Sequence, residues 1–93
     1  MQQAAITSNV QEWATDVVLP RYKHADKLTV RTGRKYHKVV ADDSSVYAFV
    51  DMEGNIYKAA SWATPAKHAR GNIFSDDKGA EALDAQGFVR YLA

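Results

Sequence analysis

Residues 45–51, Ser-Val-Tyr-Ala-Phe-Val-Asp, are the most strand-like stretch of this 93-residue chain. β-Branched and aromatic residues dominate it, and such residues are favoured on a pleated surface. Successive side chains of a strand point to opposite faces. The two aromatic residues, Tyr47 and Phe49, are therefore expected on one face, and the small aliphatic residues on the other: Val46, Ala48 and Val50. The stretch predicts a sheet with one aliphatic and one aromatic face.

Strand-forming residues also precede this stretch. Residues 28–31 and 35–41 are rich in β-branched and apolar side chains, and Gly33 marks a turn or a bulge between them. Asp42-Asp43-Ser44 has the composition of a turn, because these side chains bond readily to the nearby backbone. The first part of the sheet is therefore either two strands or one strand that continues after a bulge.

A tight turn follows the central stretch. Glu53-Gly54-Asn55 has the residues that short hairpin turns require, and Gly54 is expected at positive φ. The turn leads into a further strand over residues 55–59. Together these segments predict an antiparallel sheet of three or four strands.

A helix over residues 9–19 is predicted before the sheet. Pro20 ends it, because proline lacks the N–H of the next helical bond and clashes with the preceding turn. Two pairs of residues fit a capping box at its start: Ser8 with Gln11, or Asn9 with Glu12. The helix has one apolar stripe, expected to cover the aliphatic face of the sheet: Val10, Trp13, Ala14, Val17 and Val18.

The segment from Tyr57 to Gly71 is the main candidate for a functional site. Thr64 suits a helix N-cap, Pro65 the first helical position and Gly71 the position past the end, so a short basic helix of about six residues is predicted. Aromatic and basic side chains gather here without an acidic residue, and they are the candidate residues for nucleic-acid or partner binding: Tyr57, Lys58, Trp62, Lys67, His68 and Arg70. The alternative is that Trp62 anchors the core and the cations are solvated.

Charge is distributed unevenly along the chain, although its net value is only +1. Residues 21–70 hold ten Lys and Arg against five acids, a balance of +5. Residues 1–20 and 71–93 each have a balance of −2. This pattern indicates that residues 21–70 form a positively charged face, which would bind an anionic partner.

Length and composition predict a single domain over residues 1–93, with residues 1–7 frayed. The chain has no cysteine, so disulfides and thiolate metal sites are excluded. No apolar run approaches the ~18 residues of a membrane span, and no contact with a membrane is expected. After Gly71 an irregular tail is predicted, with a loose helix near 77–85 and a last strand or helical end over 88–92.

Patterns of catalytic residues are missing. His24, His37 and His68 lie in different predicted elements, without the short spacing of metal ligands. The sequence has no glycine-rich phosphate loop and no Gly-x-Ser-x-Gly elbow. We therefore expect a protein that is not an enzyme and needs no cofactor.

One part of the sequence resembles small uncharacterised proteins of tailed bacteriophages. The run Ile-Tyr-Lys-Ala-Ala-Ser-Trp over residues 56–62 and the run Pro-Ala-Lys-His-Ala-Arg-Gly-Asn-Ile over residues 65–73 are similar to their signature. The strand over residues 46–51 and the terminal Arg90-Tyr91-Leu92 are similar as well. The resemblance implies no chemistry. It implies a setting, either the cytoplasm of an infected bacterial host or the virion.

The sequence thus predicts an α+β fold: an N-terminal helix, an antiparallel sheet of three or four strands, a short basic helix and an irregular C-terminal tail. Two functions are compatible with it. The first is a phage accessory protein that binds nucleic acid, with cations on the phosphates and Trp62 or Tyr57 stacking on bases. The second is a protein-interaction module, either an inhibitor of a host protein or a virion component, using the aromatic face or the sheet edge. A homodimer through that edge is compatible with both.

Overall fold

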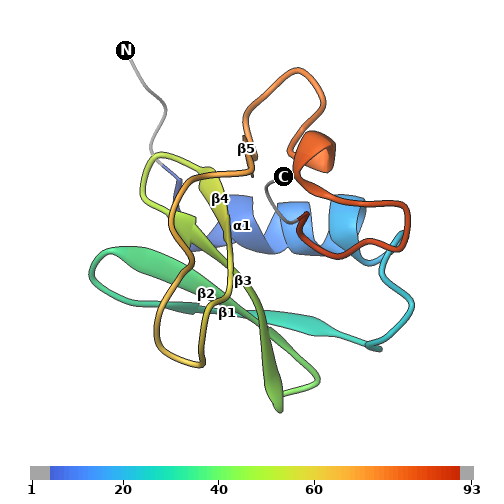
Figure 1. Ribbon diagram of the computed structural model, residues 1–93, viewed down its shortest axis with the longest axis horizontal. Helices are drawn as coiled ribbons and strands as arrows, with labels where there is room; N and C mark the ends of the chain where they lie inside the picture. Colours follow the sequence, from blue (N-terminus) through green and yellow to red (C-terminus); the bar gives the residue numbers. More distant parts are fainter. Residues whose placement is uncertain (1–4, 91–93) are drawn as a thin grey trace.

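The computed structural model describes residues 5–90. In chain order (Figure 1) its elements are α1 (Thr7–Trp13), the π-helical turn η1 (Ala14–Val18), β1 (Leu28–Thr32), β2 (Tyr36–Ala41), β3 (Ser45–Asp51), β4 (Asn55–Lys58), β5 (Gly71–Asn72) and the 3-10 turn η2 (Ala80–Ala82). The α+β class and the order of helix, then antiparallel sheet, are as predicted from the sequence.

The sheet has five antiparallel strands whose order, β1-β2-β3-β4-β5, is also their order in the chain. Four of them correspond to the predicted segments. The fifth strand, β5, is only two residues long and pairs Asn72 with Asn55 and Gly71 with Ile56. Gly54 has φ of 90°, which confirms the predicted turn between β3 and β4.

A β-bulge in β3 changes which side chains share a face. Val39 of β2 lies opposite Ala48, but the next residue, Val40, lies opposite Val46, so Tyr47 is an extra residue in β3. Tyr47 therefore points to the same side as Ala48, and its ring lies in the main hydrophobic core. The bulge interrupts the alternation, so two predictions were wrong: Tyr47 does not share a face with Phe49, and Val46 does not share one with Ala48 and Val50.

The N-terminal helix starts earlier than predicted. Its N-cap is Ile6, whose N–H donates to Oδ1 of Asn9 at 3.1 Å. Neither Ser8 nor Asn9 is the N-cap, although Asn9 fills the role of the third helical residue in a capping box. At the other end the helix widens, and the N–H of Leu19 donates to the carbonyl of Ala14 at 3.0 Å, five residues back.

The segment before the helix is tied to the sheet. The buried Ala5 donates its N–H to the carbonyl of Met52 at 2.8 Å, and its own carbonyl accepts from Nε2 of His37 at 2.8 Å. Fraying predicted for residues 1–7 therefore does not extend to residues 5–7, while residues 1–4 lie outside the described residues.

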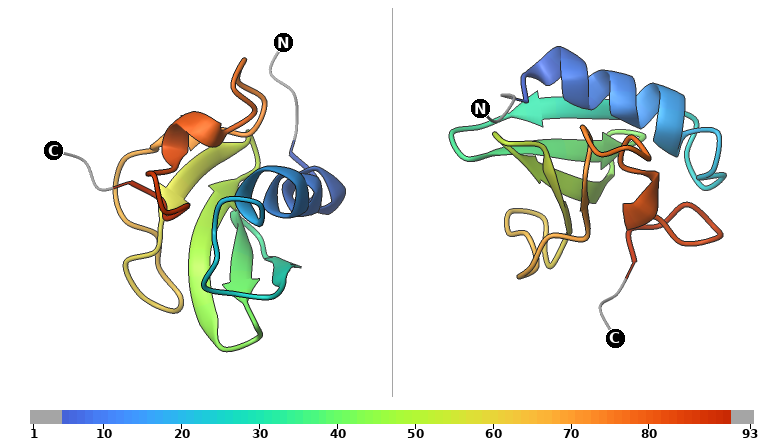
Figure 2. Two further views of the ribbon diagram at one scale, coloured as in Figure 1. Left: turned by 90° about the vertical axis from the view of Figure 1, so that its right-hand side faces the viewer. Right: turned by 90° about the horizontal axis from the view of Figure 1, so that it is seen from above.

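The core lies between one face of the sheet and two covering segments. α1 and η1 lie across β1, β2 and β3, and residues 73–89 pack against the end of the sheet formed by β4 (Figure 2). The predicted apolar stripe of the helix is confirmed, because Val10, Trp13, Ala14 and Val18 are all buried. The face that carries Ala48 and Val50 is the covered one, as expected, but it also carries Tyr47 in place of Val46. In the right-hand view of Figure 2 the loop of residues 59–70 lies on the other side of the strands.

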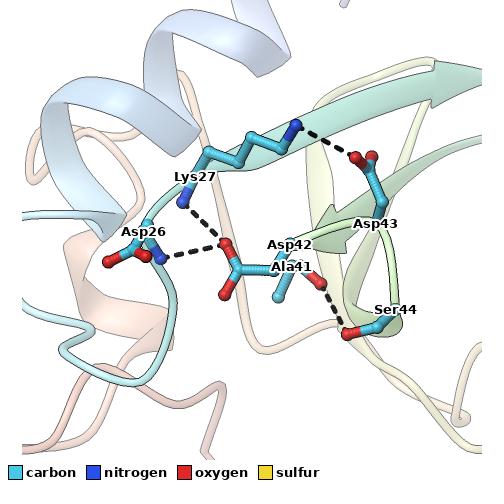
Figure 3. A network of polar contacts seen from close by, with 6 residues as sticks. All are labelled: Asp26, Lys27, Ala41, Asp42, Asp43 and Ser44. Carbon is cyan, nitrogen blue, oxygen red and sulfur yellow. Dashed lines mark hydrogen bonds and ion pairs between the residues drawn. The ribbon is translucent and has the colours of Figure 1, made fainter.

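The turn between β2 and β3 is braced from outside the sheet (Figure 3). Asp42 and Asp43 have φ of 50° and 59°, a conformation that aspartate tolerates better than most residues. Oδ1 of Asp42 accepts the N–H groups of Asp26 and Lys27, both at 3.0 Å. The exposed side chain of Lys27 forms an ion pair with Asp43 at 3.0 Å. The turn and the segment before β1 are thereby held together.

The predicted short basic helix over residues 65–70 is absent. Pro65 instead forms an isolated bridge with Ala59, and the N–H of Ala66 donates to the carbonyl of Lys58 at 2.7 Å. Six residues are too few to be helical without packing, so backbone bonds to the end of β4 decide their conformation.

The irregular tail contains less helix than expected. The helix predicted near 77–85 is reduced to η2, the three residues Ala80–Ala82. The predicted last strand is limited to an isolated bridge between Leu83 and Val89. Gly79 with φ of 85° precedes η2, and Gly87 with φ of 85° lies within the loop that the bridge closes. The prediction for residues 91 and 92 falls outside the described residues.

Candidate functional site

The face of the sheet that points away from α1 is called the outer face here. One row of side chains crosses it from β1 to β4, because the strand register pairs Arg31 with Lys38, Lys38 with Phe49, and Phe49 with Tyr57. Tyr36 lies two residues before Lys38 on the same strand and so shares this face. Basic residues occupy the β1 side of the row and aromatic residues the β4 side.

The aromatic residues of the outer face are packed edge to face. The ring of Tyr36 lies 5.9 Å from that of Phe49 and 5.8 Å from that of Tyr57, measured between centroids. Phe49 is buried although it is not part of the main core. The hydroxyl of Tyr57 donates to Oδ2 of Asp51 at 3.2 Å, and burial together with the Asp51 charge raises the pKa of Tyr57. These contacts fix the positions of the aromatic side chains on the outer face.

Trp62 lies on the outer face, next to the cations of β1 and β2. Nζ of Lys38 is 4.6 Å from the centroid of the indole ring, and Cζ of Arg31 is 6.0 Å from it, so both cations are within cation–π range. Lys38 also lies 6.0 Å from the ring of Phe49. Trp62 is nevertheless 48% exposed. The alternative that Trp62 anchors the core is therefore wrong.

The loop that presents Trp62 is fixed at its base. The N–H groups of Ala60 and Ser61 both donate to the carbonyl of Thr64, at 2.9 and 3.1 Å. Nη1 of Arg70 donates to the carbonyls of Lys67 and His68, at 2.7 and 2.6 Å. Nε of Arg70 donates to the carbonyl of Arg90 at 3.1 Å. Arg70 thus holds the loop to the C-terminal segment rather than facing a ligand.

The remaining candidates predicted from the sequence are divided between two environments. Nζ of Lys58 donates to the carbonyl of Val89 at 3.0 Å, and the side chain is half-buried on the core side of β4. Lys67 and His68 are exposed in the loop, and His68 has φ of 65°. The structure therefore brings Trp62 and Tyr57 to the outer face but does not unite all six residues in one site.

Four cations that sequence reasoning missed line a groove on the outer face, and two of them, Arg31 and Lys38, lie beside Trp62. An open groove of about 310 Å³ follows the β1–β2 hairpin, and Tyr36, Phe49 and Ala63 contribute to its lining. Its basic lining residues are Arg31, Arg34, Lys35 and Lys38. The signal was present in the sequence, because residues 27–41 hold these cations and Lys27 but no acid. We call this groove the basic groove.

Among residues 5–90, no carboxylate forms an ion pair with a cation of the basic groove. The one ion pair in this part of the chain joins Lys27 to Asp43, at the opposite end of the sheet. Asp51 is the nearest acid along the outer face, and its oxygens accept bonds from Tyr57 and from Asn55. The groove therefore retains a positive field that an anion can enter.

A second groove borders Trp62 on its other side. It has a volume of about 330 Å³, and its lining combines hydroxyl groups with small apolar side chains: Ser44, Ser45, Val46, Ala59, Ala60, Ser61 and Trp62. No charged residue lines it. We call it the hydroxyl groove.

A third groove, of about 370 Å³, lies between α1 and residues 73–78. Its rim has mixed charge, with Glu12 and Asp16 on the helix and Lys78 opposite. Trp13 contributes to its lining, and Nε1 of Trp13 is buried without a hydrogen-bond partner among the described residues.

Two kinds of feature are absent from the described residues. Between residues 5 and 90, no three histidine, aspartate or glutamate side chains are grouped so that they could bind a metal ion. No helix in this part of the chain has the length and apolar character needed to cross a bilayer.

Comparison with known proteins gives a family but no activity. No curated protein and no solved structure matches the chain. A family of unknown function, DUF7717, matches residues 1–92, which is nearly the whole sequence. The chain therefore belongs to the DUF7717 family.

Proposed function

We propose that this protein is a non-catalytic module that binds single-stranded nucleic acid through the outer face of its sheet. The observation that carries the proposal is the exposed Trp62 held over Lys38 and Arg31 beside a groove lined by four basic residues. Stacking platforms combined with positive grooves are the usual means by which proteins hold single strands.

The chemistry assigns one role to each kind of side chain. Arg31, Arg34, Lys35 and Lys38 bind phosphates of the backbone, and the exposed part of Trp62 stacks on a base. A duplex is a poorer ligand, because its bases are stacked on one another and do not offer their faces to the indole. Lys67 and His68 are exposed in the Trp62 loop and can add phosphate contacts.

The biological setting is also a proposal. The resemblance of residues 56–73 to small proteins of tailed bacteriophages supports a role as a phage accessory protein in the cytoplasm of an infected bacterium, with the virion as the alternative. A single-strand binder suits such a setting, since phage replication and transcription expose single strands.

Fluorescence anisotropy with a labelled oligothymidylate tests the proposal. We expect binding at low salt, weaker binding of a duplex of the same length, and an affinity that falls steeply as salt rises. The double variant Arg34→Ala/Lys35→Ala should reduce the slope of log K against log salt by about 1.4, at roughly 0.7 for each lost contact with a single strand. Lys23→Ala is the matched control, because Lys23 is exposed in the loop after the helix and away from the groove.

The proposal fails if the parent protein does not bind the oligonucleotide at low salt, or if the control variant lowers the slope as much as the double variant does.

A protein partner is the second candidate function. It is favoured by the same exposed Trp62, since aromatic residues on rigid platforms are common anchors of interfaces. The free side of β1 is also an edge to which another strand can add, including β1 of a second copy. Gln11 covers part of this edge, because its Nε2 donates to the carbonyl of Leu28 at 2.9 Å. The affinity for a protein partner held by apolar contacts should be nearly insensitive to salt. A homodimer formed through β1 would be detected by sedimentation of the pure protein.

A further inference from the structure

The loop that bears Trp62 separates two grooves of different chemistry. Ala63 contributes to the basic groove, while Ser61 and Trp62 contribute to the hydroxyl groove. We infer that the hydroxyl groove is a subsite for the edge of one nucleobase, and that the basic groove holds only the adjoining phosphates. The inference rests on the proposed function and adds the position at which the base is read.

The lining of the hydroxyl groove suits a base better than a phosphate. A serine hydroxyl both donates and accepts hydrogen bonds, as the edges of the bases do. Ser61 makes no side-chain hydrogen bond within residues 5–90, so its hydroxyl is available to a ligand. Ser45 pairs with the core residue Ala41, so its side chain points to the covered side of the sheet. Val46 and Ala59 supply apolar contacts beside Ser61.

Charge excludes phosphate from the same groove. The groove has no cation in its lining, and Asp42 and Asp43 directly precede Ser44 at its end. On the other side of Trp62 the cations are concentrated in the basic groove. A nucleotide stacked on Trp62 is therefore oriented with its phosphate toward Lys38 and its base edge toward Ser61.

Two ligands of equal length separate the subsites. One is an oligothymidylate, and the other is an abasic deoxyribose-phosphate chain, which keeps every phosphate but has no base. We expect the parent to bind the oligothymidylate at least about fivefold more tightly, given the usual contribution of one stacked base. Trp62→Ala should remove most of this difference.

Two variants then assign the grooves. Ser61→Ala should weaken binding of the oligothymidylate by about threefold to tenfold and leave the abasic chain unaffected, because one neutral hydrogen bond is lost. Arg34→Ala/Lys35→Ala should weaken binding of both ligands by the same factor. Ser8→Ala is the matched control, since Ser8 is an exposed serine on α1.

The outcomes distinguish the two proposals. If neither ligand binds the parent at low salt, the proposed function itself is refuted. If the oligothymidylate binds and Ser61→Ala affects both ligands equally or neither, nucleic-acid binding stands and the base subsite is overturned. Circular dichroism of each variant shows whether the fold is retained.

Discussion

The two tryptophans of the chain occupy opposite environments. Trp13 is 3% exposed and packs in the core, where its ring lies 6.4 Å from that of Tyr47. Trp62 is 48% exposed and lies on the outer face. One ring thus contributes to stability and the other is available to a partner.

Trp13→Ala should lower the free energy of unfolding by about 3–5 kcal/mol, the usual cost of emptying a large aromatic site. Trp62→Ala should lower it by less than about 1 kcal/mol, because the side chain is half exposed and its cation–π contacts are at the surface. Urea unfolding followed by circular dichroism gives both values. Equal losses in the two variants would contradict the placement of Trp62.

The glycines Gly54 and Gly33 also differ in their surroundings. At Gly54 φ is 90°, and a Cβ would lie 2.9 Å from Cδ2 of Phe74 and 3.1 Å from Cγ1 of Ile73. Gly54→Ala should therefore cost roughly 1–3 kcal/mol. At Gly33 the nearest atom would be the carbonyl oxygen of Tyr36 at 3.4 Å, so Gly33→Ala should change stability by under about 0.5 kcal/mol. Thermal or urea unfolding of the two variants makes the comparison, and a Gly54→Ala protein as stable as Gly33→Ala would refute it.

Among the elements, η2 is held to β5 by a carboxylate. Oε2 of Glu81 accepts the N–H of Asn72 at 3.0 Å, and Oε1 accepts from the hydroxyl of Ser75 at 2.7 Å. Burial alone would raise the pKa of Glu81, but these bonds and others from the backbone lower it on balance. The charged form of Glu81 is therefore the one that the fold stabilises.

This lowered pKa predicts how stability depends on pH. The contribution of Glu81 is complete above its ordinary pKa of 4.5 and is lost as the pH falls through the lowered value in the folded protein. Urea unfolding at a series of pH values should show that the advantage of the parent over Glu81→Gln decreases below about pH 4.5. Glu12→Gln, on the exposed side of α1, is the control. An advantage that stays constant down to pH 3 or increases would disprove the assignment.

Some of the secondary-structure elements could be predicted from the sequence and others could not. The helix and the four longer strands were predictable, because apolar periodicity and turn residues such as Gly54 act locally. The bulge at Tyr47 was not, since it depends on the register between β2 and β3. The conformation of residues 65–70 is decided by bonds to β4, and local helix signals from Thr64 and Pro65 are overridden.

The same distinction holds for the candidate site. Trp62 and Tyr57 were predicted from a segment that combines aromatic and basic residues without an acid, and the structure places both on the outer face. Arg31 and Lys38 were overlooked, because only the pairing of β1, β2 and β3 brings them beside Phe49 and under Trp62. Arg70 and Lys58 have the right charge, but backbone carbonyls far away in the sequence accept their hydrogen bonds.

For the whole molecule, the core joins the two ends of the described chain. It includes side chains of α1 and of the strands, together with Leu83 and Val89 near the C-terminal end. The hydroxyl of Tyr47 donates to the carbonyl of Gly87 and adds a polar link, and burial raises the pKa of Tyr47. The core therefore depends on contacts among the helix, the strands and the C-terminal segment.

The protein should therefore unfold in a single cooperative step. In the variant Trp62→Phe the fluorescence comes from Trp13 alone and reports on the core. We expect its urea transition to coincide with the loss of secondary structure in circular dichroism. Separate midpoints would show that residues 73–90 unfold independently of the sheet.

The order of the strands has a consequence for the kinetics of folding. Each strand from β2 to β4 pairs with the strand before it in the chain, across a loop of three residues, so the entropy cost of closing each loop is small. Residues 73–89, which include Val89 of the core, must close a longer loop before they can pack. We therefore expect strands β1 to β4 to pair earlier in refolding than residues 73–89 pack against them.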